Sequence, residues 1–181
     1  MRKIIVAQFI SLDGVVEAPD KWHFPYVNDE MFAVMWALND ECDTMLLGRN
    51  TYQSYAGAFA NAPADDHVAA QMNRPTKVVV SATLKELTWA NSTLLTGDVV
   101  AGVTELKNKP GGSILTSGST KLARTLLRTG LVDELNLLIH PIIIGGGAQR
   151  LFEDDGPQIP LALAHTATFS TGVTHAVYRK A

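Results

Sequence analysis

The sequence predicts an α/β fold with a mainly parallel sheet and an antiparallel edge near its C-terminal end. Two observations predict it. Short apolar runs alternate with segments that carry helical signals, and residues 161–170 and 173–180 alternate in polarity around the turn Thr171-Gly172. No linker, repeat or low-complexity stretch divides the 181 residues, so we expect one domain covering residues 1–181.

Each element is predicted from its local pattern. Apolar and β-branched runs bounded by turn residues predict strands at residues 2–10, 44–47, 77–80, 93–96, 113–116, 133–144, 161–170 and 173–180. A 3.6-residue period or a capping signal predicts helices at residues 29–40, 51–59, 98–107 and 119–129. Pro141 interrupts one strand, and Gly130 takes the position that closes a helix. Residues 14–27 show no period and predict a loop long enough to cover a binding site.

Composition and charge exclude several classes of protein. The net charge is −3, which gives no bulk attraction to nucleic acid or to an anionic membrane. Only 18% of the residues are charged, which suggests that a partner subunit or a ligand covers part of the surface. Gln8 interrupts the apolar run near the start and no cleavage pattern follows, so we expect a cytoplasmic protein. The single cysteine, Cys42, excludes an intramolecular disulfide, and the histidines show no metal-ligand spacing.

Two turns from a strand into a helix are the strongest candidate binding sites, because ligands of open α/β sheets lie beyond the carboxyl ends of strands. In the first, Gly118 leads into a helix start where free N–H groups and the hydroxyls of Ser119 and Thr120 can cradle a diphosphate. A simple capped turn explains this pattern equally well. In the second, Arg49 follows Gly48 at a helix start, where a cation opposes the helix dipole. Such an arginine indicates either a bound phosphate or plain solvation.

Two further turns are less specific. Ser11-Leu-Asp-Gly14 leads into the loop that carries Trp22, His23 and other aromatic residues, which either fill the core or flank a flat heterocycle. Asp13 can simply cap its own turn. The three glycines of Pro141–Gly147 favour a tight chain reversal over a ligand site.

Taken in order, these motifs resemble the dihydrofolate-reductase-like superfamily. They are most similar to the C-terminal reductase domain of the bifunctional riboflavin-biosynthesis deaminase-reductase, in a stand-alone form. The resemblance spans nearly the whole chain. Its motifs are Ser11-Leu-Asp-Gly14, Leu47-Gly-Arg-Asn-Thr-Tyr52, Arg74-Pro-Thr-Lys-Val-Val-Val-Ser81, Ser117-Gly-Ser-Thr120, Gly130-Leu-Val-Asp-Glu-Leu135, His140-Pro-Ile-Ile-Ile-Gly-Gly-Gly147 and Leu151-Phe152.

The resemblance implies eight strands with helices on both faces, NADPH as cofactor, and a homodimer. It places the adenosine end of the cofactor, including the 2′-phosphate on Arg49, against Gly48, Arg49, Asn50, Thr51 and Ser81. It places the diphosphate against Ser117, Gly118, Ser119, Thr120, Lys121 and Leu122. It places the nicotinamide against Ala7, Gly14 and Val15.

The sequence and this resemblance together predict an NADPH-dependent reductase that passes a hydride to a pterin-like, aminopyrimidine or related heterocyclic substrate. The activity expected is that of a riboflavin-biosynthesis-type 5-amino-6-(5-phosphoribosylamino)uracil reductase or is dihydrofolate-reductase-like. Candidate proton donors or water-orienting acids are Asp13, Asp29 and Glu30. Candidate substrate-lining residues are Trp22, Tyr52 and Phe152. Asn28 stands where folate enzymes carry an acid on the first helix, so we do not expect folate turnover. The alternatives are an NADP(H)-binding sensor or partner subunit without reductase chemistry, and a domain kept for dimer scaffolding.

Overall fold

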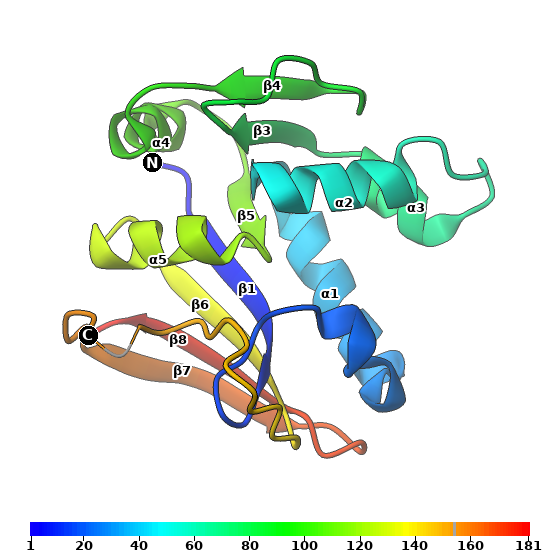
Figure 1. Ribbon diagram of the computed structural model, residues 1–181, viewed down its shortest axis with the longest axis vertical. Helices are drawn as coiled ribbons and strands as arrows, with labels where there is room; N and C mark the ends of the chain where they lie inside the picture. The colour runs from blue at the N-terminus through cyan, green and yellow to red at the C-terminus, as the bar shows by residue number, and fades with distance from the viewer. Residues whose placement is uncertain (154) are drawn as a thin grey trace.

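The computed structural model describes residues 1–153 and 155–181 and shows one eight-stranded sheet in the order β4-β3-β2-β5-β1-β6-β8-β7 (Figure 1). β1 to β6 run parallel, and β7 and β8 add an antiparallel edge. The strands are β1 Ile4–Ser11, β2 Cys42–Gly48, β3 Thr76–Val80, β4 Ser92–Leu95, β5 Ser113–Ser117, β6 Glu134–His140, β7 Leu161–Thr168 and β8 Thr174–Lys180. The predicted fold class is confirmed.

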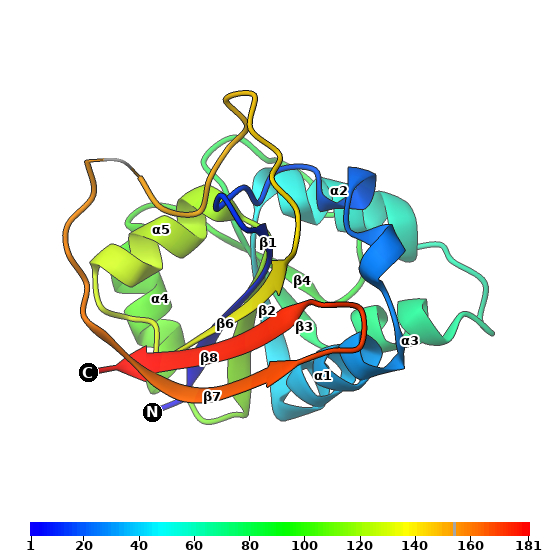
Figure 2. The ribbon, with the colours of Figure 1, turned by 90° about the horizontal axis from the view of Figure 1, so that it is seen from below.

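Helices cover both faces of the sheet. They are α1 Asp29–Glu41, α2 Arg49–Phe59, α3 His67–Asn73, α4 Val99–Asn108 and α5 Thr120–Arg128. Figure 2 shows α4 and α5 on one side and α1, α2 and α3 on the other. Alternate residues of β1 serve the two layers, because Ile4 and Val6 pack toward α5 while Ile5 and Ala7 pack beside α1. Among the described residues, no helix is long and apolar enough to cross a bilayer.

The structure corrects the sequence predictions at three places. β6 ends at His140 and does not reach residue 144, because Pro141 has no N–H with which to continue the ladder. The helix α3 was not predicted, since its seven residues, capped by the Asp66 side chain, are too few to show a helical period. The loop over residues 14–27 contains two short 3-10 turns, Pro19–Lys21 and Phe24–Tyr26.

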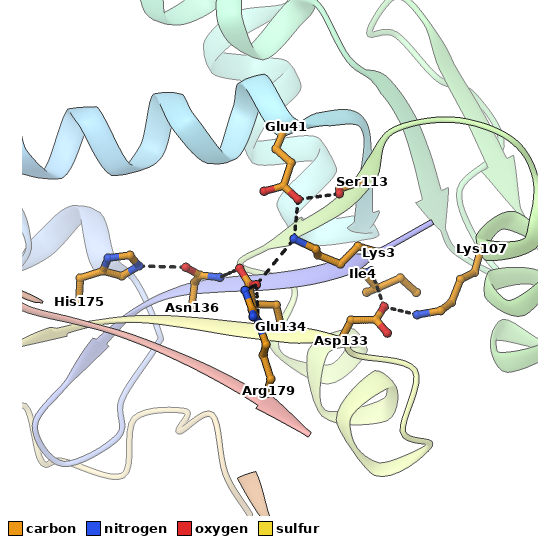
Figure 3. Close-up of polar contacts among 10 residues, drawn as sticks. All are labelled: Lys3, Ile4, Glu41, Lys107, Ser113, Asp133, Glu134, Asn136, His175 and Arg179. Carbon is orange, nitrogen blue, oxygen red and sulfur yellow. Dashed lines mark hydrogen bonds and ion pairs between the residues drawn. The ribbon is translucent and has the colours of Figure 1, made fainter. Parts of the chain in front are cut away.

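A network of polar side chains joins elements around the amino end of β6 (Figure 3). Glu134 pairs with Arg179 of β8 at 3.0 Å and with Lys3 at 3.7 Å, and Lys3 donates to Glu41 of α1 at 2.7 Å. Asn136 donates to Glu134 at 3.0 Å and bonds the His175 ring at 2.9 Å. Glu134, Asn136 and His175 are buried. The network therefore holds β6, β8 and α1 together at the end of the sheet opposite the carboxyl strand ends, where the predicted site lies.

The outer strand β7 is largely exposed. Leu163 in this strand is 56% exposed, and its neighbours on both sides are also open to solvent. An edge strand of this kind presents unpaired backbone groups to a partner. The homodimer predicted from the sequence stays a prediction.

Lys77, the second residue of β3, is fully buried. Its Nζ donates to the backbone carbonyls of Asn73 at 2.7 Å and Ala90 at 3.4 Å, and lies 4.4 Å from the centre of the Trp89 ring. Burial lowers the pKa of Lys77 from 10.5 to about 8, because the charged ammonium loses its contact with water.

We predict that Lys77→Met removes a rise in stability at alkaline pH. Below a pH of about 8 both the folded and the unfolded chain carry the Lys77 proton, whereas between about 8 and 10.5 only the unfolded chain retains it. The free energy of unfolding of the wild type therefore rises across this window relative to the variant. Urea unfolding at several pH values measures the difference, with the exposed Lys85→Met as control. Parallel curves for wild type and Lys77→Met would contradict the prediction.

Candidate functional site

The carboxyl ends of five parallel strands meet at one edge of the sheet. β3, β2, β5, β1 and β6 lie side by side in that order, and they end at Val80, Gly48, Ser117, Ser11 and His140. The turns that follow these residues include all four candidate turns of the sequence. Ligands of open α/β sheets bind at such an edge.

The starts of α2 and α5 are joined directly. The Gly48 N–H donates to the Ser119 hydroxyl oxygen at 2.9 Å, and the Ser119 N–H donates to the Thr51 hydroxyl oxygen at 2.9 Å. Because β2 and β5 are neighbours in the sheet, the helices that leave them begin side by side. The structure thus brings together two predicted turns, although Gly48 and Ser119 are 71 residues apart in the sequence.

These two helix starts differ from the other three in the way they are capped. The side chains of Asn28, Asp66 and Asp98 cap α1, α3 and α4. Within the described part of the chain, neither α2 nor α5 has a side-chain cap or an acidic residue in its first turn. The leading N–H groups of any helix have no intrahelical acceptor, and at α2 and α5 no side-chain cap among the described residues replaces it. The positive dipole ends of both helices lie at the same place. Such an arrangement is suited to an anion with several oxygens.

The backbone at the α5 start is shaped for close approach. Gly118 has φ +62°, and a Cβ there would lie 3.2 Å from the Thr51 side chain. Ser119 also takes a left-handed conformation, with φ +49°. The Gln8 side chain of β1 donates to the Gly118 carbonyl at 2.5 Å and holds the turn against the sheet. Residue 118 thus requires glycine. The Ser119 N–H is taken by the Thr51 hydroxyl, which leaves the N–H groups that follow it at the start of α5 for a ligand.

Arg49 lies on the outer, β3 side of this cradle. It is exposed, and its guanidinium donates to the Thr83 hydroxyl at 2.8 Å and to Gln53 at 3.4 Å. Ser81 is buried, and its hydroxyl accepts the N–H groups of Thr83 and Leu84, so it shapes the loop that carries Thr83. Arg49 therefore keeps its charge available to a ligand beside the α2 start.

The other predicted cofactor residues differ in what they can offer. Asn50 and Lys121 are exposed, Thr120 is half-buried, and the side chains of Val15 and Leu122 belong to the core, which leaves only their backbone for a ligand. Tyr55 was missed by the sequence analysis. Its hydroxyl lies 3.3 Å from the Ser117 hydroxyl, and its position four residues after Thr51, on the same face of α2, was the available signal.

Asp13 anchors the loop after β1. Its carboxylate accepts the N–H groups of Ile144 at 3.0 Å and Gly145 at 2.9 Å, and the Ser11 hydroxyl donates to it at 2.7 Å. These bonds, led by the one from Ser11, hold the pKa of Asp13 far below its usual range. An acid kept ionised in this way is a poor proton donor, so the structure favours an anchoring role for Asp13.

The two acids of α1 lie apart from the cradle. Glu30 accepts the hydroxyl and N–H of Ser170, both at 2.7 Å, in the turn between β7 and β8, and these bonds lower its pKa. Asp29 is exposed at the start of the helix. Neither acid comes together with Asp13 or with the two helix starts, so the structure does not gather the three predicted acids into one group.

The three predicted substrate residues occupy different environments. Tyr52 is only 2% exposed, and its hydroxyl accepts the N–H of Trp89 at 2.9 Å, so it is a core residue with no face for a substrate. This placement corrects the prediction for Tyr52. Trp22 packs against the last residue of β6, His140, with 5.1 Å between ring centres. Phe152 is 51% exposed beside an open hollow of about 480 Å³ that Arg124, Arg150 and Glu153 also line.

Comparison with known proteins shows the family. Residues 2–175 match the RibD C-terminal domain family. The chain belongs to this family. A relative named uncharacterized protein YyaP, from Bacillus subtilis (strain 168), is 31% identical over 181 residues, which cover 98% of this chain and 94% of the relative.

Solved structures share the fold. A putative riboflavin biosynthesis protein from Shewanella sp. PV-4 is 22% identical with a TM-score of 0.78, and the match covers 99% of each chain. A pyrimidine reductase-like protein from Corynebacterium diphtheriae is 15% identical with a TM-score of 0.72, covering 98% of this chain and 91% of that one. The deaminase/5-amino-6-(5-phosphoribosylamino)uracil reductase of Thermotoga maritima is 13% identical with a TM-score of 0.72, over 99% of this chain but 57% of that one.

We predict that Asp13→Asn lowers the stability of the RibD-family fold more at neutral pH than in strong acid. The folded-state pKa of Asp13 lies far below its ordinary value of 3.8, so its contribution is fully present above 3.8 and is lost progressively as the pH falls from there through the folded-state pKa. Denaturant unfolding of wild type and variant at pH 7 and near pH 2 measures the contrast, because the deficit of the variant should be smaller at the lower pH. A deficit of the same size at both pH values would show that the carboxylate charge is not the cause. Asp20→Asn, an exposed acid of the same loop, is the control.

Proposed function

We propose that the protein is an NADPH-dependent reductase that transfers a hydride to a heterocyclic substrate of the aminopyrimidine or pterin-like class. The observation that carries the proposal is the pair of uncapped helix starts, joined through Gly48, Thr51 and Ser119, with Arg49 beside them. Two anion sites in one edge fit a dinucleotide that carries a diphosphate and one further phosphate. Membership of the RibD C-terminal domain family supports the same function.

The strand order supports one direction for the bound cofactor. With the diphosphate at the starts of α2 and α5, Arg49 marks the β3 side as the side of the phosphorylated adenosine. The nicotinamide then extends the opposite way, past β5 toward β1 and β6. Neighbouring strands lie about 4.8 Å apart, so β6 is about 10 Å from β5, within reach of the other half of a dinucleotide.

The ends of β1 and β6 suit a reacting heterocycle. Ala7 leaves a small side chain beside α1, and Phe9, the next residue on the same face, lies among the aromatic residues of the loop over 14–27. When bound, the nicotinamide supplies the hydride. The chain's own residues bind and orient the two rings: the helix starts hold the phosphates, and the loop that Asp13 anchors excludes water from the reacting carbon.

Titration of the protein with NADPH, followed by cofactor fluorescence, tests the cofactor assignment. Oxidation of NADPH at 340 nm is then followed with 5-amino-6-(5-phosphoribosylamino)uracil, a dihydropterin and a quinone as candidate acceptors. Turnover of the pyrimidine or the pterin is the expected result. Absence of binding at micromolar NADPH overturns the proposal, and binding without oxidation of any acceptor indicates a nucleotide-binding protein without reductase chemistry.

We predict that Arg49→Gln weakens NADPH binding by at least about tenfold, the equivalent of about 1.4 kcal/mol, because hydrogen bonds to charged groups contribute about 1.5–3 kcal/mol. NADH lacks the 2′-phosphate, so its affinity changes little. Arg74→Gln, an exposed arginine that pairs with Asp40 away from the cradle, is the matched control. Equal losses for NADPH and NADH in Arg49→Gln would exclude a contact between Arg49 and the 2′-phosphate.

A further inference from the structure

A buried histidine lies at the end of β6 toward which the proposed cofactor extends. His140 is fully buried, and it is the register partner of Ser11, the last residue of β1. Its Nδ1 lies 2.8 Å from the Leu138 carbonyl, and its buried Nε2 has no hydrogen-bond partner in the described part of the chain. A buried ring nitrogen without a partner is costly in a native fold, which points to a functional reason for it.

Aromatic rings of the loop over 14–27 surround His140. Its ring meets Trp22, Tyr26 and Phe9 edge-on, with ring centres 5.1, 5.5 and 5.7 Å away. The second histidine, His23, meets it in the same manner at 6.2 Å. His140 therefore holds the loop aromatics in position, and it acts on a substrate only through them.

His23 is stacked within this cluster. Its ring lies flat on Phe9, with centres 4.7 Å apart and planes 16° apart, and Phe24 lies against it at 4.4 Å. Its Nδ1 is buried without a partner among the described residues. Its Nε2 is not among the buried nitrogens and makes no hydrogen bond within that part of the chain, so this nitrogen is open to a ligand.

The position of His23 relates it to the proposed hydride site. Phe9 and Ala7 lie on one face of β1, two residues apart, which separates them by about 6.6 Å along the strand. That distance is about the width of one heterocycle. A substrate ring that extends from a nicotinamide at Ala7 toward Phe9 approaches the ring on which His23 is stacked.

The reduction also needs a proton, and the three carboxylates predicted from the sequence are poorly placed to supply one. Asp13 and Glu30 are held as ionised acceptors, and Asp29 lies in the same first turn of α1 as Glu30. His23 belongs to the aromatic cluster at the ends of β1 and β6, and its Nε2 is accessible to a ligand.

We propose that His23 is the proton donor of this reductase, with His140 as its positioning residue. The inference rests on the proposed function. The carbon of a C=N or C=O bond in the substrate gains the hydride, and the π electron pair moves onto the nitrogen or oxygen. That atom takes the proton from Nε2 of the His23 imidazolium, which becomes neutral imidazole and is protonated again from solvent.

The surroundings of His23 set the expected pH dependence. Burial lowers the pKa of His23 from its ordinary 6.5, the neighbouring His140 lowers it further, and Asp20 raises it. Tyr26 is the remaining titratable group in contact with the cluster. The imidazolium population, and with it the rate of proton-coupled hydride transfer, falls tenfold per pH unit above this pKa. Activity is therefore expected to decline from mildly acidic toward neutral pH.

The variant His23→Phe tests the proposal, because it keeps an aromatic ring between Phe9 and Phe24 but carries no proton. We expect single-turnover hydride transfer at pH 6 to fall by about a hundredfold. The decline with pH seen in the wild type should disappear, while the affinity for NADPH stays unchanged. His165→Phe, which replaces an exposed histidine of β7, should behave as the wild type.

A second measurement does not depend on turnover. Imidazole NMR signals of His23 should shift when oxidised cofactor and 5-aminouracil are added together, whereas those of His165 should not. Two results would overturn the role of His23 alone. In the first, the wild type oxidises NADPH and His23→Phe shows the same pH profile. In the second, the His23 signal does not move. A wild type that neither binds NADPH nor oxidises it with any acceptor overturns the proposed function, and the role of His23 with it.

Discussion

The free N–H groups at the starts of α2 and α5 are the constraint on which the functional edge depends. Parallel pairing of β2 and β5 makes both helices begin at one place, and the exchange of hydrogen bonds among Gly48, Thr51 and Ser119 fixes their separation. At the starts of α1, α3 and α4, a side-chain cap accepts leading N–H groups. Here the hydroxyls tie one turn to the other, and the remaining donors stay available. A fold with net charge −3 can thereby attract an anion locally.

The other half of the edge is organised by a carboxylate. Asp13 ties the turn after β1 to Ile144 and Gly145, residues more than 130 positions later in the chain. The loop over 14–27 is thereby fixed at its base, and its aromatic rings close around His140. Backbone N–H donors on one side of β1 are thus suited to the phosphates of a cofactor, and packed aromatic rings on the other side are suited to a heterocyclic substrate.

The local sequence pattern was sufficient to predict those elements whose structure depends on a single segment of the chain. The β-branched runs predicted the strands, and Gly118 and Arg49 marked the two turns that meet. Tyr52 could not be placed in this way, because Tyr52 and Tyr55 both pack into one core cluster. Only contacts with distant segments distinguish them, since the Tyr52 hydroxyl meets Trp89 and the Tyr55 hydroxyl meets Ser117. The partners of Asp13 and the stacking of His23 were likewise beyond reach, since both depend on contacts between segments distant in sequence.

The central position of β1 has a consequence for how the chain folds. β1 pairs with β5 and β6, and the register partner of Ile4 in β5 is Ile114. This buried central strand is therefore synthesised about a hundred residues before the strands that flank it. Contacts of such long range slow folding. Until β5 and β6 emerge, the apolar segment Ile4–Ile10 has no strand to pair with and is exposed to association with other chains. Folding of the nascent protein therefore depends on keeping β1 unpaired until β5 and β6 have been synthesised.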